Sequence, residues 1–596
     1  MKSVNERIAA LRQRMKENGV NACIIPSSDP HMSEYLPAHW EARSYFSGFD
    51  GSAGTLVVTE KESGLWTDGR YFIQAERQLS GSEIVLYRMG VKGVPTYLEY
   101  LVDKLSEGET VGFDGKLISA SSVKKMKDKF APKPLNCKSV DLIDGIWDER
   151  PEIPASEVFV HDVQYAGYTC REKLDQVRAE LKKQKADGEI FTQLDCVAWL
   201  MNIRAQDIDY NPMAISYAVV YSDSAFLFIN MNRVLPETMA YLKENGVTVC
   251  AYEEIDSALE QISEKKTIFV DTESLSEHLY AILEKNEYVT ILNGRDTVTD
   301  LKCVKNETEI NSMIEAHIKD GCALVGFRVK LDERMQNGET VTECTICDML
   351  RECRAKQANN RGESFGTIAA YEANAAMMHY SPQPQTCSTI ENKGFLLVDS
   401  GGQYLEGTTD ITRTFAMGAL TFEQKEHYTY VLKAHIALSQ AVFLEGCTGG
   451  NVDILSRVQV WKHGIDYRCG TGHGVGMFSG VHEGPQNLRI SSTVPFKKGM
   501  MITNEPGIYI EGKYGIRTEN IMLVTAFTSN EYGEFYKFDT ITYFPIDTAG
   551  ILFELMTEEE VEWLNNYHKM VYEKLSPRLS GKELDWLKKH TEPVYR

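Results

Sequence analysis

Acidic residues within or beside apolar segments of the last third of the chain constrain the fold more than any other feature. Asp399 ends the run "FLLVD", Glu505 follows "MMITN", and Glu519 precedes "NIMLV". A carboxylate inside an apolar strand is costly unless it is paired with a cation or bound to a metal. Each of these acids therefore needs a partner that the fold must bring to it.

Two more residues extend this pattern. Asp410 opens the alternating run "DITRTF" after the glycine-rich stretch that follows Asp399, and His473 stands in "GTGHGVG". Two strands joined by such a stretch predict a hairpin that brings Asp399 and Asp410 side by side. Taken singly, each residue is better explained as a satisfied core group or a solvated strand end. Four acids and one histidine on the strands of one domain favour a shared cation.

The composition of this set indicates the chemistry. Four carboxylates carry too much negative charge for one divalent ion, but they suit two ions about 3.5–4 Å apart. Oxygen-rich ligation with a single imidazole favours Mn²⁺, Mg²⁺ or Co²⁺ over a structural zinc. Two such ions activate a water molecule and stabilise the oxygens of a tetrahedral intermediate. The implied reaction is hydrolysis.

The chain length and composition limit the classes of protein. A chain of 596 residues is too long for one core and predicts about three to four domains. The net charge of −22 is spread along the chain, which argues against nucleic acid or an anionic membrane as a partner. No apolar stretch approaches the ~18 residues of a membrane span. We expect a cytoplasmic protein.

The N-terminal half contains two similar segments. "RIAALRQRMKENGVNACIIP" passes from an amphipathic helix, with Ile8, Leu11 and Met15 on one face, through Asn18-Gly19 into an apolar strand, and "KLDQVRAELKKQKADGEIF" repeats this order. The likeness indicates a duplicated α/β domain. We predict domains at 1–155, 156–304 and 305–596, with the proline-containing stretch 148–162 as the first linker. In the first domain, "LWTDGRYF" predicts a strand, an Asp-Gly turn and a second strand.

The thirteen cysteines are odd in number and irregularly spaced, as expected for reduced thiols. Cys344 and Cys347, with Cys353 nearby, form the one group that could hold a metal. They stand in a helical pattern with no second Cys or His pair at zinc-finger spacing, so we do not favour a zinc site there.

The order Asp, Asp, His, Glu, Glu, in "VDSGGQYLEGTTDITRT", "GTGHGVGMFSGVHEGPQ" and "NEPGIYIEGKYGIRTEN", closely resembles the aminopeptidase P family. The chain looks like the long, three-domain cytosolic form, because "FSGFDGSAG", "WTDGRYF" and "LDCVAWLMNIRAQDIDYNP" match its N-terminal domains. This resemblance implies an α/β and α+β multidomain fold: two creatinase-N-like α/β domains followed by a pita-bread catalytic domain with a C-terminal extension.

The resemblance also implies roles for individual residues. Two divalent ions, with Mn²⁺ expected and Co²⁺ or Zn²⁺ as alternatives, would be held by Asp399, Asp410, His473, Glu505 and Glu519. Glu505 would also act as general base for the bridging water that attacks the peptide bond. His379 and His482 fall on the family's catalytic, substrate-binding histidines, and Arg517 on an arginine that braces the metals and the substrate.

Cys469 departs from the family pattern, because long-form members usually carry histidine four residues before the metal-binding histidine. A thiol is shorter than an imidazole and a weaker hydrogen-bond donor. We expect Cys469 to line the substrate side of the pocket without binding metal; a thiol turned away into the core is the alternative.

The family resemblance implies removal of the first residue from peptides whose second residue is proline. Long-form relatives are commonly dimers, so we expect a homodimer. Tyr371 and Tyr404 are candidates for lining the proline pocket. The competing readings are a prolidase-type Xaa-Pro dipeptidase, a metal-free creatinase-like amidinohydrolase and a pita-bread scaffold that binds partners without catalysis.

Overall fold

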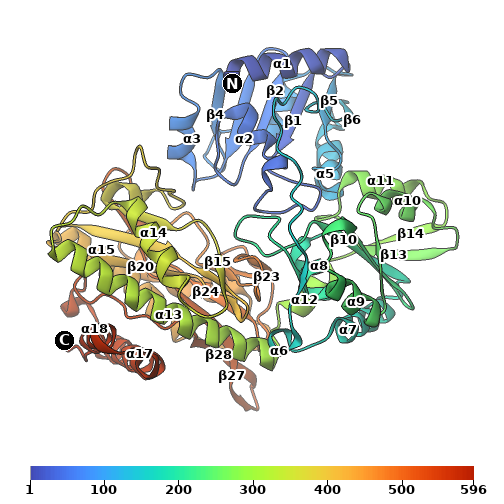
Figure 1. Cartoon of the computed structure of the whole chain (residues 1–596). Helices are drawn as coiled ribbons and strands as arrows, with labels where there is room; N and C mark the ends of the chain where they lie inside the picture. The colour runs from blue at the N-terminus through green and yellow to red at the C-terminus, as the bar shows by residue number, and fades with distance from the viewer. Residues whose placement is uncertain (1) are drawn as a thin grey trace. The chain divides into compact units, whose positions relative to one another are not determined.

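The computed structural model describes residues 2–596, and it divides into two compact units (Figure 1). One unit contains the residues through Asp162 together with Tyr168–Asp300, and the other contains Val163–Gly167 and Leu301–Arg596. No helix among residues 2–596 is both long enough and apolar enough to cross a membrane.

The first unit begins with a six-stranded mixed sheet of order β4-β3-β2-β1-β5-β6. Its strands are β1 (Ala22–Pro26), β2 (Thr55–Thr59), β3 (Ser63–Thr67), β4 (Ile84–Arg88), β5 (Thr110–Phe113) and β6 (Asn136–Ser139). Its helices are α1 (Val4–Glu17), α2 (Ala42–Ser47), α3 (Phe72–Gln78), α4 (Tyr97–Lys104) and α5 (Ala120–Phe130).

Helices cover both faces of this sheet because side chains along a strand alternate between its faces. In β1, Ile25 packs into a core shared with Ile8 and Leu11 of α1, whereas Ile24 packs into a second core with Val123 of α5. The predicted amphipathic helix is confirmed, since Ile8, Leu11 and Met15 are buried in α1.

A second six-stranded sheet, of order β12-β11-β10-β8-β13-β14, repeats the first. In each sheet the third strand in this order pairs antiparallel with the second and with the fourth, and the other three pairs are parallel. The shared pairing pattern agrees with the predicted duplication. The strands are β8 (Gly188–Phe191), β10 (Ser216–Tyr221), β11 (Ala225–Ile229), β12 (Val247–Cys250), β13 (Lys266–Val270) and β14 (Val289–Asn293).

The helices around the second sheet are α7 (Cys170–Gln184), α8 (Leu194–Met201), α9 (Pro236–Glu244), α10 (Glu254–Glu260), α11 (Glu277–Lys285) and α12 (Thr297–Lys302). Two short strands that flank α7 and α8 in the sequence, β7 (Phe159–Val160) and β9 (Ile203–Arg204), form a separate antiparallel pair.

The prediction for "LWTDGRYF" was half wrong. Its first part is the strand β3, and the Asp68 carboxylate accepts hydrogen bonds from the backbone and side chain of Arg70 in the turn. The second part begins the helix α3 at Phe72, and Ala75 of that helix is completely buried in the core. Packing against the sheet therefore overrides the strand preference of a short aromatic segment.

The second unit contains the long helix α13 (Glu307–Gln336) and six others. They are α6 (Val163–Ala166), α14 (Glu343–Arg354), α15 (Phe422–Ser439), α16 (Gly449–Trp461), α17 (Glu558–Leu575) and α18 (Gly581–His590). The main core joins Phe327 of α13, Leu350 of α14 and Leu432 of α15 to strand residues such as Leu396. Figure 1 shows α13 and α15 beside the strands of this unit.

Five small sheets, rather than one large one, fill the second unit. One contains β16 (Ile368–Tyr371), β17 (Phe395–Ser400) and β20 (Ile411–Ala416), and another contains β24 (Met501–Asn504), β27 (Asn520–Asn530), β28 (Gly533–Thr540) and β21 (Val442–Leu444). The others are β15 (Asn360–Glu363) with β18 (Gly402–Tyr404) and β19 (Gly407–Thr408); β22 (Gly472–Gly474) with β23 (Glu483–Leu488); and β25 (Gly507–Ile510) with β26 (Tyr514–Arg517).

Candidate metal centre

The predicted hairpin that carries Asp399 and Asp410 is confirmed. Strands β17 and β20 pair antiparallel with Asp399 opposite Thr412 and Ser400 opposite Ile411, and β18 and β19 lie between them in the sequence. Asp410 immediately precedes β20, so it lies at the end of the hairpin where Asp399 leaves β17. The pairing register therefore brings the two carboxylates to one place.

A second antiparallel pair positions the two glutamates. Strands β24 and β27 pair with Asn504 opposite Asn520. Glu505 comes directly after β24 and Glu519 directly before β27, so both acids lie at the same end of this pair. Arg517, at the end of β26, pairs with Gly507 of β25 and joins them there.

His473 is the middle residue of β22, and close backbone contacts explain the glycines around it. A Cβ atom on Gly472 would lie 1.9 Å from the carbonyl oxygen of Thr503, and one on Gly474 would lie 2.1 Å from the carbonyl oxygen of Glu483. Only glycine lets the backbone approach neighbouring strands this closely. These glycines therefore seat His473 against β24 and β23.

These elements bring the predicted ligands together. Ligand atoms of Asp410, His473 and Glu519 all lie within 4.8 Å of one another. The Nε2 atom of His473 lies 3.4 Å from Oδ2 of Asp410 and 3.5 Å from Oε1 of Glu505. Asp399 is close enough that its negative charge, with those of Asp410 and Glu505, raises the pKa of Glu519.

The crowding of buried negative charge shifts the proton affinities of the group. Burial, opposed by Arg517 and assisted by Asp410 and Glu505, raises the pKa of Asp399 to about 7. Burial and the neighbouring carboxylates also raise the pKa of Glu519 well above its ordinary value. Burial opposes the charge on His473, but the hydrogen bond with Asp410 and the charge of Glu505 outweigh it and raise the pKa to about 9. Without a cation, the group therefore binds protons more tightly than the same side chains would in water.

The donor set fits divalent cations. The Oδ1 atoms of Asp399 and Asp410 are buried and accept no hydrogen bond from residues 2–596. Buried carboxylate oxygens without a partner are costly, and a bound cation would satisfy them. Four carboxylates and one imidazole are the oxygen-rich ligands that Mn²⁺ and related ions accept.

The remaining predicted residues differ in their burial and in their surroundings. His482 is exposed, and its ring meets the ring of His473 edge-on at 4.2 Å between centroids. His379 is half-buried and follows the short helix η3 (Glu372–Ala376), which contacts β25 and β26. Cys469 is half-buried, and burial together with the charge of Glu505 raises the pKa of its thiol to about 12.

Sequence reasoning missed three hydroxyl groups that hold these side chains. Thr412 donates to Glu519 at 2.6 Å between Oγ1 and Oε2, and Thr503 donates to Glu505 at 3.2 Å while accepting from the backbone N–H of His473 at 3.0 Å. Tyr509 accepts from Arg517 at 2.6 Å. Thr412 and Thr503 each stand two residues from a predicted ligand on a strand, and that spacing, which places side chains on one face, could have found them.

Tyr404 was a wrong candidate for the proline pocket. It is completely buried, and its hydroxyl donates to Asp320 at 2.9 Å. Tyr371 is buried as well, with its hydroxyl donating to the carbonyl of Lys393 at 2.9 Å. Both rings belong to the core, where apolar packing and one hydrogen bond satisfy a tyrosine.

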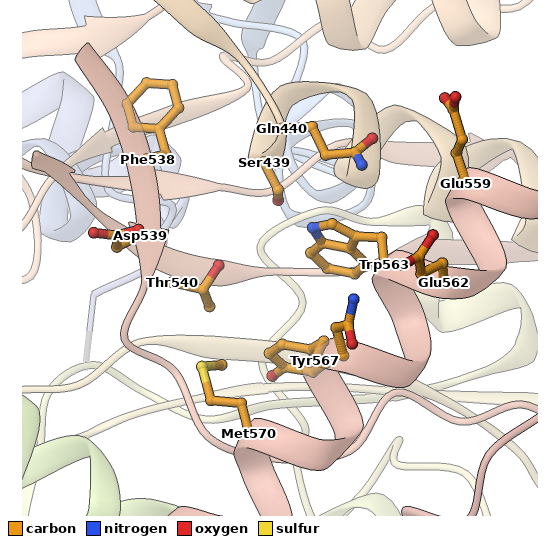
Figure 2. A pocket seen from close by; sticks show the side chains of 11 residues that line it. Ser439, Gln440, Phe538, Asp539, Thr540, Glu559, Glu562, Trp563, Tyr567 and Met570 are labelled. Carbon is orange, nitrogen blue, oxygen red and sulfur yellow. The ribbon is translucent and has the colours of Figure 1, made fainter. Parts of the chain in front are cut away.

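A separate hollow of about 480 Å³ lies in the second unit between α17, the end of α15 and β28. Figure 2 shows Trp563, Tyr567 and Met570 of α17 along this hollow, with Glu559 and Glu562 on the same helix. None of the predicted site residues lines it, so the hollow is not the metal centre.

Family models cover nearly all of the chain. The model described as metallopeptidase family M24 matches residues 311–526, and the C-terminal region of peptidase M24 matches residues 534–594. Models described as creatinase/prolidase N-terminal domain match residues 7–146 and 149–309.

Curated relatives match over the full length. A probable Xaa-Pro aminopeptidase P from Laccaria bicolor is 39% identical over 99% of this chain and 94% of the relative. Aminopeptidase P2 from Arabidopsis thaliana is 37% identical over 99% of this chain and 89% of the relative.

Solved structures agree with this result. X-prolyl aminopeptidase from Caenorhabditis elegans, described as a cytosolic enzyme with a di-nuclear active site, matches with a TM-score of 0.95 and 33% identity over 100% of both chains. Dipeptidase PepE from Mycobacterium ulcerans matches with a TM-score of 0.51 and 21% identity over 65% of this chain and 98% of its own, which supports a common fold. The creatinase-N and pita-bread folds predicted from sequence are confirmed, and the chain belongs to the Xaa-Pro aminopeptidase P family of M24 metallopeptidases.

Proposed function

We propose that this chain is a metal-dependent aminopeptidase that hydrolyses the bond between an N-terminal residue and a following proline in peptides. The observation that supports this function is the convergence of Asp410, His473 and Glu519 into one group that could hold a metal ion, in a chain that matches the aminopeptidase P family over 99% of its residues. A scaffold without catalysis would have no need to keep buried carboxylates whose oxygens lack partners.

Asp399, Asp410, His473, Glu505 and Glu519 are the proposed ligands of two divalent ions. Mn²⁺ is the proposed metal, because oxygen-rich ligation with one imidazole suits it, and Co²⁺ or Zn²⁺ would also fit the ligands. When bound, two such ions lower the pKa of a water molecule and polarise the carbonyl that is attacked. The four carboxylates supply the negative charge that keeps both cations in place.

Glu505 is the proposed general base. Its side chain is 21% exposed, whereas the side chains of Asp399 and Asp410 are 11% and 5% exposed. Glu505 is therefore the most open of these carboxylates toward a substrate and a water molecule. The hydroxyl of Thr503 donates to its Oε1 atom at 3.2 Å, which limits the rotation of the carboxylate. A base must be held within hydrogen-bond reach of the proton that it accepts.

The substrate is proposed to contact His379, His482, Arg517 and Cys469. His482, exposed beside His473, can donate to a peptide carbonyl and stabilise the charge that develops on it. Arg517 braces Asp399, because its Nη2 atom donates to Oδ2 of that residue at 2.5 Å. A dedicated pocket is needed because a bond to proline lacks the N–H by which general peptidases recognise a peptide.

We further propose that the chain forms a homodimer in the cytoplasm. Helix α16 exposes Ile454, Val458 and Trp461 by 38%, 45% and 37%. These positions follow the i, i+4, i+7 spacing of one helix face, and an exposed apolar face of this kind is typical of a surface that binds a protein. A second copy is the proposed occupant, because the same face on two chains makes a self-complementary contact.

The state of the cysteines supports the proposed cytoplasmic location. All thirteen are free thiols, as is typical of proteins in a reducing compartment.

Substrate length and metal dependence test the proposed function together. We expect bound divalent metal in the purified protein, cleavage of Xaa-Pro-Xaa tripeptides, and loss of that activity with a chelator and its return with Mn²⁺. Cleavage of Xaa-Pro dipeptides alone would identify a dipeptidase. Metal-independent hydrolysis of an amidino substrate would identify a creatinase-like enzyme. No bound metal and untouched tripeptides would identify a binding scaffold.

A further inference from the structure

The stretch of chain that leads to His473 has no regular structure of its own. Residues 465–470 lie between α16 and β22 and are neither helix nor strand. Carbonyl groups in such a stretch need donors from elsewhere when water cannot reach them. What holds this loop therefore also determines where β22 and His473 lie.

Arg457, on α16, supplies two of these donors. Its Nη1 atom donates to the carbonyl of Tyr467 at 3.0 Å, and its Nη2 atom donates to the carbonyl of Cys469 at 2.8 Å. The guanidinium also lies over the ring of Tyr467, 4.3 Å from its centroid. One planar cation thus clamps three points of the loop, which a guanidinium can do because its donors form a rigid fork.

Asp453, one helical turn earlier on α16, completes the clamp. It is completely buried and accepts a hydrogen bond from Nε of Arg457 at 2.6 Å. Its other oxygen accepts from the hydroxyl of Thr471, which also hydrogen-bonds the hydroxyl of Tyr467 at 2.7 Å between the oxygens. The pair on α16 therefore holds the loop through both its backbone and its side chains.

The clamp continues directly to two of the proposed metal ligands. The carbonyl of Thr471 accepts from the backbone N–H of Glu505 at 2.8 Å. Two residues later, the N–H of His473 donates to the hydroxyl of Thr503 at 3.0 Å. A shift of the loop would therefore displace Glu505 and His473 together.

We propose that Asp453 and Arg457 are positioning residues that fix the loop 467–471, and through it the placement of His473 and Glu505 in the metal centre. This inference rests on the proposed function, since it assigns the clamp a role in metal binding and catalysis. It goes beyond that function because neither residue touches the ligand set by its own side chain. Groups that orient metal ligands in this way typically change metal affinity or activity about 10- to 100-fold when altered.

The same unit contains a matched pair with a purely structural setting. Arg328 and Asp332 on α13 are also four residues apart, with Nη2 and Oδ1 2.9 Å apart, and the Arg328 guanidinium lies 4.2 Å from the ring centroid of Phe415. Arg328→Lys therefore reproduces the chemical change of Arg457→Lys at a pair that does not hold the loop 467–471. In both variants lysine keeps the charge but cannot serve several acceptors with a fork.

The test compares Arg457→Lys with Arg328→Lys and the unaltered chain by calorimetric titration with Mn²⁺ and by tripeptide hydrolysis at saturating Mn²⁺. We expect Arg457→Lys to weaken Mn²⁺ binding and lower kcat by about 10-fold or more, with KM changed less than about threefold. Arg328→Lys should leave both quantities near those of the unaltered chain. Equal Mn²⁺ affinity and kcat in the two variants would overturn the inference.

A second pair of variants covers the case in which Arg457→Lys does not fold. Thr471→Val removes the hydroxyl that joins Asp453 to Tyr467 but leaves the ion pair intact, and we expect the same losses. Thr471→Ser restores the hydroxyl and should restore Mn²⁺ affinity and kcat; failure to do so would contradict the inference. If the unaltered chain itself neither binds Mn²⁺ nor cleaves tripeptides, the proposed function fails and the inference falls with it. If it does both and the clamp variants match it, only the inference fails.

Discussion

Arg517 and Asp399 form a buried ion pair at the edge of the metal centre, with 2.5 Å between Nη2 and Oδ2. The other oxygen of Asp399 accepts no hydrogen bond from residues 2–596, and Tyr509 accepts from Nη1 of Arg517 at 2.6 Å. The arginine thus holds one carboxylate oxygen and leaves the other for a cation. Its positive charge also opposes the effect of burial on the Asp399 pKa, which is raised to about 7.

Replacing Arg517 by methionine should weaken Mn²⁺ binding at pH 7. Without the guanidinium, the pKa of Asp399 should rise further, so the carboxyl group keeps its proton and competes with the metal. We expect at least about 10-fold weaker Mn²⁺ binding at pH 7 and partial recovery at pH 8.5. Calorimetric titration measures both. Tyr509→Phe, which keeps the ion pair, is the control and should bind Mn²⁺ nearly as the unaltered chain does; unchanged affinity in Arg517→Met would refute this role.

Replacing Glu505 by glutamine should separate folding from catalysis. Glutamine keeps the shape and one acceptor oxygen but cannot take a proton. We expect a folded protein that retains part of its metal and loses about 10²–10⁴-fold or more in kcat on a tripeptide. Metal content and melting temperature, measured on the same preparation, serve as controls. Activity comparable to that of the unaltered chain would remove Glu505 from the mechanism.

Metal binding should depend steeply on pH. In the metal-free protein His473 has a pKa raised to about 9 and Asp399 a pKa raised to about 7. A metal ligand must release its proton, so Mn²⁺ affinity should rise between pH 6 and pH 9, by about 10-fold per pH unit for each proton released. Titration calorimetry in two buffers of different ionisation enthalpy counts the protons. A Mn²⁺ affinity that stays constant from pH 6 to pH 9 would contradict the raised pKa values of His473 and Asp399.

The same shifts predict how the metal-free protein responds to pH. A raised folded-state pKa gives stability that is complete below the unfolded-state pKa and is lost as the pH rises through the folded-state value. For His473 this loss runs from about 6.5 to about 9. For Asp399 it runs from about 3.9 to about 7. We expect the melting temperature of the metal-free protein to fall from pH 6.5 to pH 9, and excess Mn²⁺ to abolish that fall. A melting temperature that rises over this range without metal would contradict the prediction.

Alkylation of Cys469 should be slow but damaging. Burial and Glu505 raise the pKa of its thiol to about 12, so little reactive thiolate is present at pH 7.5. We expect iodoacetamide to react with it more slowly than with a small thiol free in solution and to lower kcat/KM once it has reacted. Mass spectrometry reports the modification, and Cys469→Ala tests whether the loss arises at this residue. Cys469→His should alter kcat/KM as well. Full activity after complete alkylation would place the thiol outside the substrate pocket.

An acidic substitution on the exposed face of α16 should separate the proposed dimer. Val458 is 45% exposed, and a charge there would be buried between two copies. We expect Val458→Asp to convert a dimer into a monomer in light scattering coupled to size exclusion. Phe422→Asp, at an apolar side chain that is 64% exposed on α15, is the matched control and should remain dimeric. A dimer in both variants would exclude this face as the interface.

Much of the fold follows from local sequence patterns. The amphipathic spacing of Ile8, Leu11 and Met15 predicts α1 because a helix places these residues on one face. The hairpin of β17 and β20 follows from two strand patterns joined by a glycine-rich stretch, since the turn brings neighbours in sequence together. The helix α3 does not follow in this way, because its burial depends on a sheet formed by strands from elsewhere in the chain.

The sequence by itself determined which residues could bind metal: four acids and His473 stand in strand patterns where an unpartnered charge is costly. Only the tertiary structure decided how they are held. Arg517 meets Asp399 across 118 residues, and Thr412 meets Glu519 across 107. Arg457 reaches the loop before His473 through carbonyl groups, which every residue type carries. Hydrophobic patterns of period two or 3.6 indicate which face of a strand or helix a residue occupies. They do not indicate which distant segment packs against that face, and the candidate metal centre is built from contacts between such distant segments.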